Sequence, residues 1–403
     1  MQKSLLTYLQ DETKRQNEGL ELIASENFAS KAVRELAGSI LTNKYAEGFP
    51  GKRYYGGCQN IDKIESLAIE LLCQLYGAKY ANVQPHSGSS ANMIAYYALI
   101  NPGDTILSLG LDEGGHLTHG SPVNFSAKYY RILHYHLNQD GRINYNQLEE
   151  IALKERPQLI LAGFSAYPYL IDFARISEVA KKIGAVFMVD MAHIAGLIAG
   201  GVHPSPLPYA DVVTSTTHKT LRGPRGGIIL TNSEEIIKKI NKATFPGLQG
   251  GPLENIIAAK AQCFYEASQP EFREYAKQVI VNTAATADTL TKLGATVCGT
   301  ETHLFLLDTK TSYGLTGVEA ENRLEEIGIT VNKNMLPGDT ERPTITSGIR
   351  IGLAALTTRG LSEENAKKVG ELIHKFLAKQ ISKEVAQTHV KALASTLANV
   401  ENL

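Results

Sequence analysis

Between residues 60 and 265, short apolar runs alternate with segments of helical period, and this alternation constrains the fold more than any other feature of the chain. The apolar runs lie at 81–83, 105–107, 130–133, 159–161, 186–189 and 212–213. Short buried strands that alternate with helices are typical of a mainly parallel sheet, because parallel neighbours need a crossover connection. The pattern predicts an α/β domain whose sheet is flanked by helices.

Helix boundaries in the same region follow from cap signals. A helix over 64–76 follows Asn60 and Asp62 as candidate caps, and a helix over 178–183 ends before Gly184. A third helix, over 91–99, begins after a Ser/Gly turn. The order of the strands does not follow from these signals.

The pattern changes near residue 270, which indicates a second unit. We predict a long amphipathic helix over 271–293, apolar runs at 304–307 and 349–351, and a final helix over 363–377 with Ser362 as its cap. These elements are typical of a smaller α+β domain. The chain is expected to divide into an N-terminal arm and helix (1–55), a large domain (56–268) and a small C-terminal domain (269–403).

Composition excludes several classes of function. The 403 residues are 43% hydrophobic with a formal net charge of -1, so no charge pattern indicates a surface for nucleic acid or an anionic membrane. No apolar stretch has the length of a signal peptide or a membrane span. The four cysteines lack metal-ligand spacing and are typical of reduced thiols. We expect a cytoplasmic protein without a metal, nucleic-acid partner or membrane partner.

Lys219 stands at a predicted corner between two strands. It lies in the segment TSTTHKT (214–220), and a Gly/Pro turn at 222–227 leads into the next strand. Burial lowers the pKa of a lysine, and a neutral amine can attack a carbonyl to form a Schiff base, as in pyridoxal phosphate (PLP) enzymes. The alternative is a solvated lysine in a turn.

Polar residues follow three of the predicted strands, at the sheet edge where α/β proteins bind ligands. The turn QPHSGSS (84–90) opens a helix and can bind a phosphate, or Ser89 or Ser90 can be an ordinary N-cap. Asp190 can pair with a pyridinium nitrogen, or act as a helix cap or metal ligand. Ser165 can bond a ring hydroxyl, or be a plain loop serine.

Two further residues carry ligand hypotheses. His116 can stack on a cofactor ring or be a structural histidine, whereas a metal site with His119 lacks a nearby set of further ligands. Arg350 lies in a predicted apolar strand, where a guanidinium needs a partner. That partner is either a substrate carboxylate or an internal acidic side chain.

Residues 43–57 (NKYAEGFPGKRYYGG) form an aromatic arm. The segment is too rich in glycine for regular structure and too aromatic for a linker. It is expected to lie against a surface, such as that of a second subunit.

Taken together, these segments resemble the serine hydroxymethyltransferase family, PLP enzymes of fold type I, over nearly the whole chain. Beside the lysine segment, the motifs that carry the resemblance are LIASENF (22–28), KRYYGGC (52–58), QPHSGS (84–89), VDMAH (189–193), FPGLQGGP (245–252) and TSGIR (346–350). The resemblance implies a large domain with a mainly parallel sheet and a smaller α+β domain.

The resemblance also implies roles for the cofactor-binding residues. Lys219 corresponds to the Schiff-base lysine, Asp190 to the pyridinium partner and His116 to the stacking imidazole. Ser165 and His193 would face the ring hydroxyl, and the phosphate would be bound by Ser87, Gly88 and Ser89 with Gly250 and Gly251 of a neighbouring subunit. His218 and Tyr45 complete the cofactor-binding set, and Thr216 is implied as a catalytic residue together with Lys219, His116, Asp190, Glu47 and Tyr55.

For the substrates, the resemblance implies that Arg350 and Ser25 bind the amino acid carboxylate. Tyr45, Glu47 and Tyr55 would cross a dimer interface into the other subunit's site, with Glu47 next to the substrate hydroxyl. The pterin of the folate would contact Leu111, Gly115, Leu117 and Asn334. The expected assembly is a homodimer or a higher homo-oligomer.

The implied function is PLP-dependent interconversion of serine and glycine, with tetrahydrofolate as the one-carbon acceptor. The alternatives are a folate-independent aldolase for 3-hydroxy amino acids and a non-enzymatic scaffold with the same fold. The chain departs from the family pattern at Glu113 and Leu248, at Leu353-Ala354 where a proline is common, and mildly at Ser215. Glu113 lies beside the expected pterin contacts and leaves folate affinity open.

Overall fold

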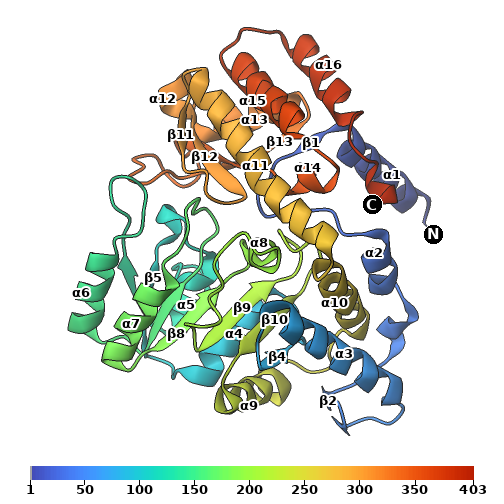
Figure 1. The fold of residues 1–403 in the computed structure, drawn as a ribbon, viewed down its shortest axis with the longest axis vertical. Helices are drawn as coiled ribbons and strands as arrows, with labels where there is room; N and C mark the ends of the chain where they lie inside the picture. Colours follow the sequence, from blue (N-terminus) through green and yellow to red (C-terminus); the bar gives the residue numbers. More distant parts are fainter. Residues whose placement is uncertain (1) are drawn as a thin grey trace. The chain divides into compact units, whose positions relative to one another are not determined.

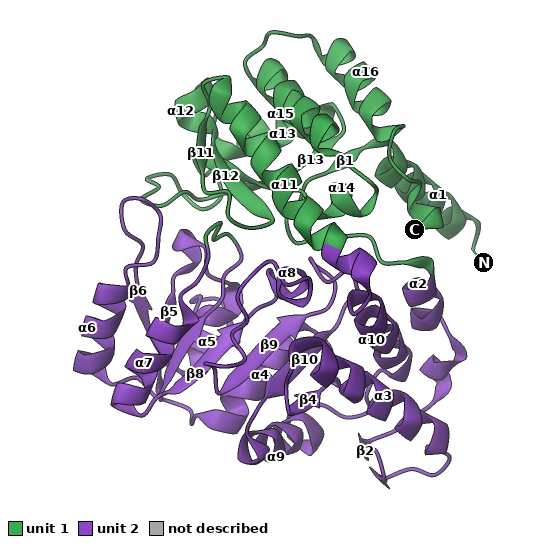
Figure 2. Cartoon of the chain, viewed as in Figure 1, with its two compact units in different colours: residues 1–31, 166–169, 274–403 green, residues 32–165, 170–273 purple. Residues whose placement is uncertain are grey.

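The computed structural model describes residues 2–403, which divide into two compact units (Figure 2). Unit 1 contains the chain up to Lys31 together with residues 166–169 and 274–403, and unit 2 contains residues 32–165 and 170–273. The N-terminal helix therefore groups with the C-terminal part of the chain, and the aromatic arm groups with unit 2. The functional domain boundaries at residues 55 and 268 stay predictions.

Unit 2 is built on a seven-stranded sheet with the order β4-β10-β9-β8-β7-β5-β6 (Figure 1). The strands β9, β8, β7, β5 and β6 pair in parallel, whereas β10 is antiparallel to both β9 and β4. The predicted α/β fold with a mainly parallel sheet is confirmed. The strands are β4 (Tyr80–Asn82), β5 (Thr105–Leu109), β6 (Arg131–Tyr135), β7 (Leu159–Ala162), β8 (Val186–Asp190), β9 (Val212–Thr216) and β10 (Gly227–Thr231).

Helices cover this sheet because its strands are apolar on both faces. All residues of β5, β7, β9 and β10 are buried. Ile94 of α4 packs in one core cluster with Leu161, Met188 and Ile229 of three strands. The helices are α2 (Lys31–Ala37), α3 (Gln59–Tyr76), α4 (Gly88–Leu99), α5 (Phe125–Tyr129), α6 (Tyr145–Glu155), α7 (Phe173–Ile183), α8 (Ala195–Ala199), α9 (Glu234–Lys242) and α10 (Glu254–Ala267).

Three predicted helix starts in unit 2 were wrong, those of α3, α4 and α7. Helix α3 begins at Gln59, so Asn60 and Asp62 lie inside its first turn instead of capping it. Helix α4 begins at Gly88, and its N-cap is Ser87, whose hydroxyl accepts the Ser90 amide hydrogen at 3.1 Å. Side-chain caps are selected by local geometry that composition does not reveal.

The C-terminal end of α7 was predicted correctly. Gly184 follows the helix with φ of 73°, a conformation that favours glycine. The start of α7 was missed, because the helix extends back to Phe173 with Asp172 as its N-cap.

Unit 1 contains a four-stranded antiparallel sheet with the order β11-β12-β15-β14 and a parallel pair of β1 and β13. These are β1 (Leu20–Glu21), β11 (Thr296–Cys298), β12 (Leu304–Asp308), β13 (Ile329–Thr330), β14 (Asn332–Asn334) and β15 (Gly348–Gly352). The helices include α1 (Lys3–Glu18), α11 (Pro270–Lys292), α12 (Thr309–Tyr313), α13 (Gly317–Glu326), α14 (Ala354–Thr358), α15 (Glu363–Leu377) and α16 (Lys383–Ala394).

Two expectations for unit 1 and the arm need correction. Helix α15 begins after Ser362 as predicted, but it is not the last, because α16 follows it. The arm is not wholly irregular, since β2 (Gly48–Phe49) and β3 (Lys52–Arg53) pair as a short hairpin. Among the helices of residues 2–403, none is long and apolar enough to cross a membrane.

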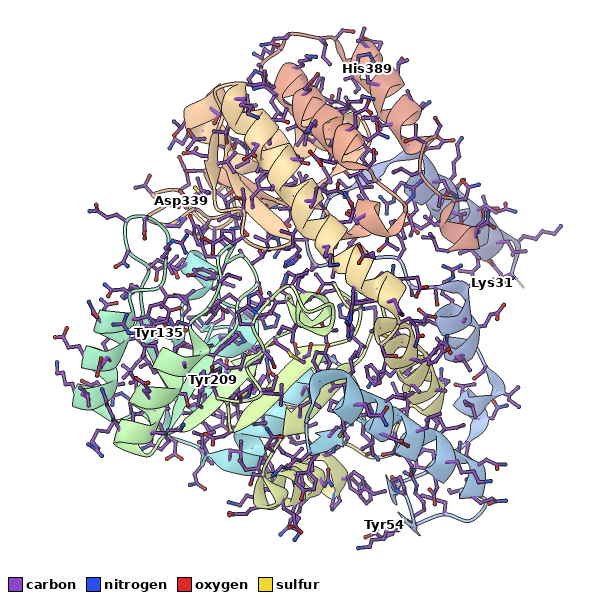
Figure 3. All side chains as sticks on the ribbon, in the orientation of Figure 1. Lys31, Tyr54, Tyr135, Tyr209, Asp339 and His389 are labelled. Atoms are coloured by element: carbon purple, nitrogen blue, oxygen red, sulfur yellow. The ribbon has the colours of Figure 1, made fainter. Side chains whose placement is uncertain are left out.

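Figure 3 labels two tyrosines of unit 2 that differ in exposure, one at the end of β6 and one in the arm. Tyr135, at the end of β6, is fully buried, and its hydroxyl donates to the Leu161 carbonyl oxygen at 3.0 Å. Tyr54 of the arm is 73% exposed.

Candidate active site

The ends of β7, β8 and β9 bring several predicted site residues to one edge of the sheet. Asp190 ends β8 and lies opposite Thr214 of the neighbouring parallel strand. The loop that follows β7 toward Ser165 passes so close that a Cβ on Gly163 would collide with the Asp190 carbonyl oxygen. The backbone of Gly163 also has φ of 105°, a conformation that favours glycine.

Asp190 is a buried carboxylate with three hydrogen-bond donors. Its Oδ2 accepts from Asn92 Nδ2 at 2.8 Å and from His119 Nε2 at 3.2 Å, and its Oδ1 accepts from the Ala192 amide at 3.0 Å. Burial alone would raise its pKa, but the His119 hydrogen bond and the nearby His119, His116 and Lys219 hold the pKa of Asp190 well below its usual range. The side chain therefore presents a negative charge at neutral pH.

His116 is neutral and held in one tautomer. Its Nδ1 accepts from the Thr118 amide at 3.2 Å and lies 2.7 Å from the Thr118 hydroxyl, which in turn accepts from Asn92 Nδ2 at 2.8 Å. Burial, with His119 and Lys219 nearby, lowers the pKa of His116 to about 4. The hydrogen of the neutral ring is consequently on Nε2.

The same region has the dimensions of a metal site. His116, His119 and Asp190 offer ligand atoms that all lie within 4.8 Å of one another. However, each of these side chains is already engaged: Nδ1 of His116 accepts from Thr118, His119 donates to Asp190, and Asp190 accepts from Asn92 as well. We interpret the cluster as a support for an organic ring.

Lys219 lies in the corner between β9 and β10, as predicted. The side chain is buried, with an exposed fraction of 8%. The turn around it is closed by backbone bonds from Arg222 N to the Lys219 carbonyl oxygen (3.1 Å) and from Gly223 N to that of Thr217 (2.6 Å). The adjoining Thr220 hydroxyl donates to the carbonyl oxygen of His193 at 2.9 Å. These bonds fix the backbone from which the amine projects.

Two polar atoms beside Lys219 are left for a ligand. Within residues 2–403, Thr216 Oγ1 and His218 Nδ1 are buried and have no hydrogen-bond partner. Burial, followed by the charges of Lys219 and Arg225, lowers the pKa of His218 to about 3, so this imidazole is neutral. Buried polar atoms of this kind need a partner, which a bound group can supply.

The predicted phosphate loop (residues 84–90) packs directly against this corner. A Cβ on Gly88 would collide with the Thr216 side chain, and one on Gly227 would collide with the Ser87 carbonyl oxygen. Gly88 is buried, and Ser89 in the first turn of α4 is exposed. The loop leads into the N-terminus of α4, and the backbone N–H groups at such a terminus can bind a phosphate.

The residues expected to act in a neighbouring subunit lie together on this chain. The Tyr45 and Tyr55 rings are 5.2 Å apart and edge to face. A Cβ on Gly251 would come within 3.0 Å of the Tyr45 ring, and one on Gly250 within 3.2 Å of Glu47 Oε1. Tyr45 and Tyr55 are 55% and 47% exposed. The arm and the Gly250-Gly251 loop therefore form one continuous surface.

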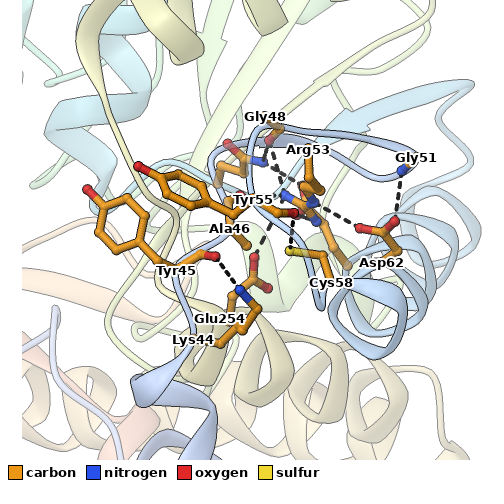
Figure 4. A network of polar contacts seen from close by, with 12 residues as sticks. Lys44, Tyr45, Ala46, Gly48, Gly51, Arg53, Tyr55, Cys58, Asp62 and Glu254 are labelled. Carbon is orange, nitrogen blue, oxygen red and sulfur yellow. Dashed lines mark hydrogen bonds and ion pairs between the residues drawn. The ribbon is translucent and has the colours of Figure 1, made fainter.

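Arg53 holds the backbone of this arm (Figure 4). Its guanidinium donates to the carbonyl oxygens of Ala46 (2.9 Å) and Gly48 (3.1 Å), the two residues that flank Glu47. Gln84 donates to the same Gly48 oxygen at 2.9 Å. The position of Glu47 is thus set by its backbone neighbours.

Acidic side chains fix the guanidinium of Arg53 in turn, and of these Glu65 and Glu254 are buried and Asp62 is partly exposed. Asp62 and Glu65 accept from it at 2.8 and 2.6 Å, and Glu254 Oε1 lies 3.8 Å away without a hydrogen bond. Burial, together with the charge of Glu65, raises the pKa of Glu254 to about 8. Asp62, predicted as a cap of α3, is therefore an anchor for the arm.

In unit 1, Arg350 and Ser25 form a polar pair at the sheet. Arg350 is buried in β15, its Nε donates to Asn332 Oδ1 at 3.1 Å, and its Nη2 lies 3.5 Å from the Ser25 hydroxyl. Burial lowers the pKa of Arg350 to about 10, which leaves it cationic at neutral pH. A buried guanidinium with a neighbouring hydroxyl suits a carboxylate ligand.

The residues expected at the pterin are placed in both units. In unit 2, Leu111 and Leu117 lie on short 3-10 turns with 49% and 45% of their surface exposed. Gly115 lies between them, and its amide donates to the Gly110 carbonyl oxygen at 2.8 Å. In unit 1, Asn334 ends β14 and donates to the Met335 carbonyl oxygen at 2.6 Å.

The departures from the family pattern have local explanations. Glu113 pairs with His136 Nδ1 at 2.8 Å and accepts from the Leu137 amide at 3.1 Å. Leu248 packs against the core of unit 2, and Leu353 is fully buried in the core of unit 1 just before α14. None of these contacts favours a folate-independent aldolase.

Sequence reasoning missed Asn92 and Thr118, and it assigned no role to His119 beyond the rejected metal site. These residues support Asp190 and His116 through the hydrogen bonds described above. The sequence signal for Asn92 is a polar residue within an apolar stretch of the predicted helix. In the structure its side chain is fully buried in α4. Its partners come from distant segments and have no spacing pattern.

These residues fit a bound PLP group. The anionic Asp190 suits a pyridinium nitrogen, and the neutral His116 offers a flat face. Thr216 Oγ1 and His218 Nδ1, in the same segment as Lys219, are buried without a hydrogen-bond partner among residues 2–403. The N-terminus of α4 at Ser87 and Gly88 suits a phosphate.

Comparison with known proteins gives the same assignment. The family model for serine hydroxymethyltransferase matches residues 1–373. The serine hydroxymethyltransferase of Lactobacillus gasseri is 56% identical over 393 residues, which is 96% of this chain and 95% of the relative. That of Lactobacillus johnsonii is 56% identical over 376 residues, covering 92% and 91%. The chain belongs to the serine hydroxymethyltransferase family, PLP-dependent transferases that interconvert serine and glycine with tetrahydrofolate as the one-carbon acceptor.

Proposed function

We propose that the sheet edge of unit 2 holds the PLP of this serine hydroxymethyltransferase, with Lys219 as its covalent anchor. The observation that carries the assignment is the buried, triply hydrogen-bonded Asp190, whose pKa lies below its usual range, in electrostatic contact with Lys219. Asp190 would pair with the ring nitrogen, and His116 would stack on the ring. Ser165, His193 and His218 would bind its polar substituents, with Thr216 as a further catalytic residue.

When bound, the cofactor withdraws electrons from the α-carbon of the amino acid and so weakens the bonds at that carbon. The residues of the chain select which bond breaks. Arg350 and Ser25 bind the carboxylate of the substrate, which orients the amino acid. Orientation of this kind supplies on the order of 7–11 kcal/mol of barrier reduction in well-aligned systems.

We further propose that each site is completed by a second copy of the chain. Tyr45, Glu47, Tyr55, Gly250 and Gly251 would enter the partner's site, where the glycines meet the phosphate bound by Ser87, Gly88 and Ser89. The support is that these residues form one surface whose tyrosines are exposed in a single chain. Glu47 then moves a proton at the substrate hydroxyl oxygen.

The small-molecule partners are serine, glycine and the folate, whose pterin would contact Leu111, Gly115, Leu117 and Asn334. The exposed Leu111 and Leu117 supply apolar surface for such a ring. We expect the enzyme to act in the cytoplasm. The four cysteines form no disulfide, as expected in a reducing compartment.

The direct test is conversion of serine to glycine with and without tetrahydrofolate. The PLP-loaded protein should release glycine from serine rapidly only when tetrahydrofolate is present, because the acceptor removes the one-carbon fragment. Allo-threonine, which needs no acceptor, serves as the comparison substrate. Equal serine turnover in both conditions would contradict the proposed folate-dependent reaction.

A further inference from the structure

Lys260 lies behind the phosphate loop and makes an unusual set of contacts. It belongs to α10, and its exposed fraction is 1%. Its Nζ donates to three backbone carbonyl oxygens, those of Val83 (2.6 Å), Pro85 (3.1 Å) and Gly227 (2.8 Å). No role described above uses this side chain.

The three carbonyl groups come from two segments that meet at the phosphate site. Val83 and Pro85 belong to the chain that leaves β4 and becomes the Ser87 loop, and Gly227 begins β10. The Gly227 amide also donates to the Pro85 carbonyl oxygen at 2.9 Å. Lys260 therefore ties the start of the loop to the strand that leaves the Lys219 corner.

The number of acceptors matches the charged form of the side chain. An ammonium group has three N–H donors and no lone pair, so it can satisfy all three carbonyl oxygens, whereas a neutral amine would turn a lone pair toward one of them. Burial lowers the pKa of Lys260 to about 7, and the charge of Glu65 opposes that shift. The three charge-assisted hydrogen bonds favour the ammonium in this position.

The space around the side chain is closely filled. A Cβ on Gly226 would collide with Lys260 Cε, and the Gly226 carbonyl oxygen accepts from the Thr217 amide at 3.1 Å. Removal of the ammonium would take a donor from three buried carbonyl oxygens, of which that of Pro85 would keep the Gly227 amide, and would weaken the hold of β10 on the loop.

We propose that Lys260 is a positioning residue for the cofactor phosphate, acting through the backbone of residues 83–87 and adding a buried positive charge behind the loop. It touches neither the cofactor nor the substrate. The inference rests on the proposed assignment of Ser87, Gly88 and Ser89 to the phosphate. It predicts that Lys260 controls affinity for the phosphate group and has little effect on affinity for the ring.

The test compares PLP with pyridoxal, which has the ring and aldehyde but no phosphate. Both are titrated by visible absorption into apo-protein of the wild type, Lys260→Met, Lys260→Gln and the exposed control Lys238→Met. Lys260→Met should weaken PLP binding by roughly 10-fold or more, as expected for lost hydrogen bonds to a charged donor, and leave pyridoxal binding nearly unchanged. Lys260→Gln, which keeps two donors without the charge, should fall between Lys260→Met and the wild type.

The outcomes separate this inference from the assignment on which it rests. A wild type that binds PLP and pyridoxal equally would contradict the phosphate assignment itself. A wild type that prefers PLP, with an equal preference in both Lys260 variants, would overturn the positioning role alone. Equal weakening of both ligands, or failure of both variants to fold by circular dichroism, would also overturn it, because Lys260 would then serve the fold as a whole.

Discussion

Two regions of unit 2 carry chemistry, and they differ in how complete they are within a single chain. At the ends of β8 and β9, Asp190 and Lys219 are buried, and the carboxylate of Asp190 has three donors from this chain. On the arm, Tyr45 and Tyr55 are about half exposed, although the backbone beneath them is tightly held by Arg53.

For the proposed homo-oligomer, the difference predicts which part of the site would need a second chain. At the strand ends, all three donors to Asp190 come from the same chain. The arm combines a fixed backbone with exposed side chains, which is the arrangement of a surface built to be covered by a partner. The buried Arg53 anchor explains how so glycine-rich a segment keeps its shape.

The largest effect is expected from Lys219→Gln at the buried region. Loss of the amine should abolish repeated turnover and the visible absorption of covalently bound cofactor, because no other group in the corner can replace the nucleophile. The fold should persist, as judged by circular dichroism. Lys238→Gln on the exposed face of α9 is the control and should behave as wild type.

On the arm, Glu47→Gln should lower kcat by about 10²–10⁴-fold, the usual contribution of a group that transfers a proton. Cofactor absorption should remain, since Glu47 does not anchor the PLP in this account. Steady-state kinetics with serine and tetrahydrofolate measures the change. Loss of cofactor absorption together with activity would show that Glu47 also holds the cofactor. That result would contradict the proposed difference between the two regions.

The anchor of the arm is tested by Arg53→Met, which leaves Glu65 and Asp62 without their cation. Removing one partner of a buried ion pair costs about 3–5 kcal/mol, so the free energy of unfolding in urea should fall by that amount. Arg131→Met is the matched control, because its pair with Glu155 has an arginine that is 56% exposed and should contribute less than about 1 kcal/mol. Equal losses in the two variants would show that Arg53 is no special anchor.

A smaller loss of stability is expected at acidic pH, and it should arise from His116 in the buried region. Burial lowers the pKa of His116 from 6.5 to about 4, so between these values the unfolded chain binds a proton that the folded chain does not. The free energy of unfolding of the apo-protein should therefore fall as the pH falls from 6.5 to 4, by up to about 3 kcal/mol from this residue at about 1.4 kcal/mol per pKa unit.

Urea unfolding at several pH values measures this dependence. His116→Gln should remove the share of His116 and leave that of His218, whose pKa burial lowers to about 3. The exposed His389→Gln should leave the dependence unchanged. The idea fails if His116→Gln retains the full wild-type loss between pH 6.5 and 4.

The sequence was sufficient for features that depend on local pattern. The apolar runs located the strands of the sheet, Gly184 located the end of α7, and Ser362 located the start of α15. Each depends on the chemistry of a few neighbouring residues. The motifs around Lys219 and Asp190 placed both residues at one edge because parallel strands end together.

The missed features depend on contacts between distant segments. Asn92 meets Asp190 across 98 positions of sequence, and Lys260 reaches Val83 across 177. The anchoring of Arg53 by Asp62 was hidden because an aspartate near a helix start resembles a cap. Such pairs are set by tertiary packing, which local periodicity does not encode.

In the proposed dimer, the arm of one chain completes the site of another. This arrangement is tested by mixing the Lys219→Gln and Glu47→Gln proteins, exchanging subunits under mild denaturation, and assaying tetrahydrofolate-dependent glycine formation from serine. If the arm acts in the partner, each mixed dimer has one site with both native residues, and random mixing should restore about a quarter of wild-type activity. If the arm acts in its own chain, every site carries one substitution, and activity that stays at the level of the separate variants would contradict the claim.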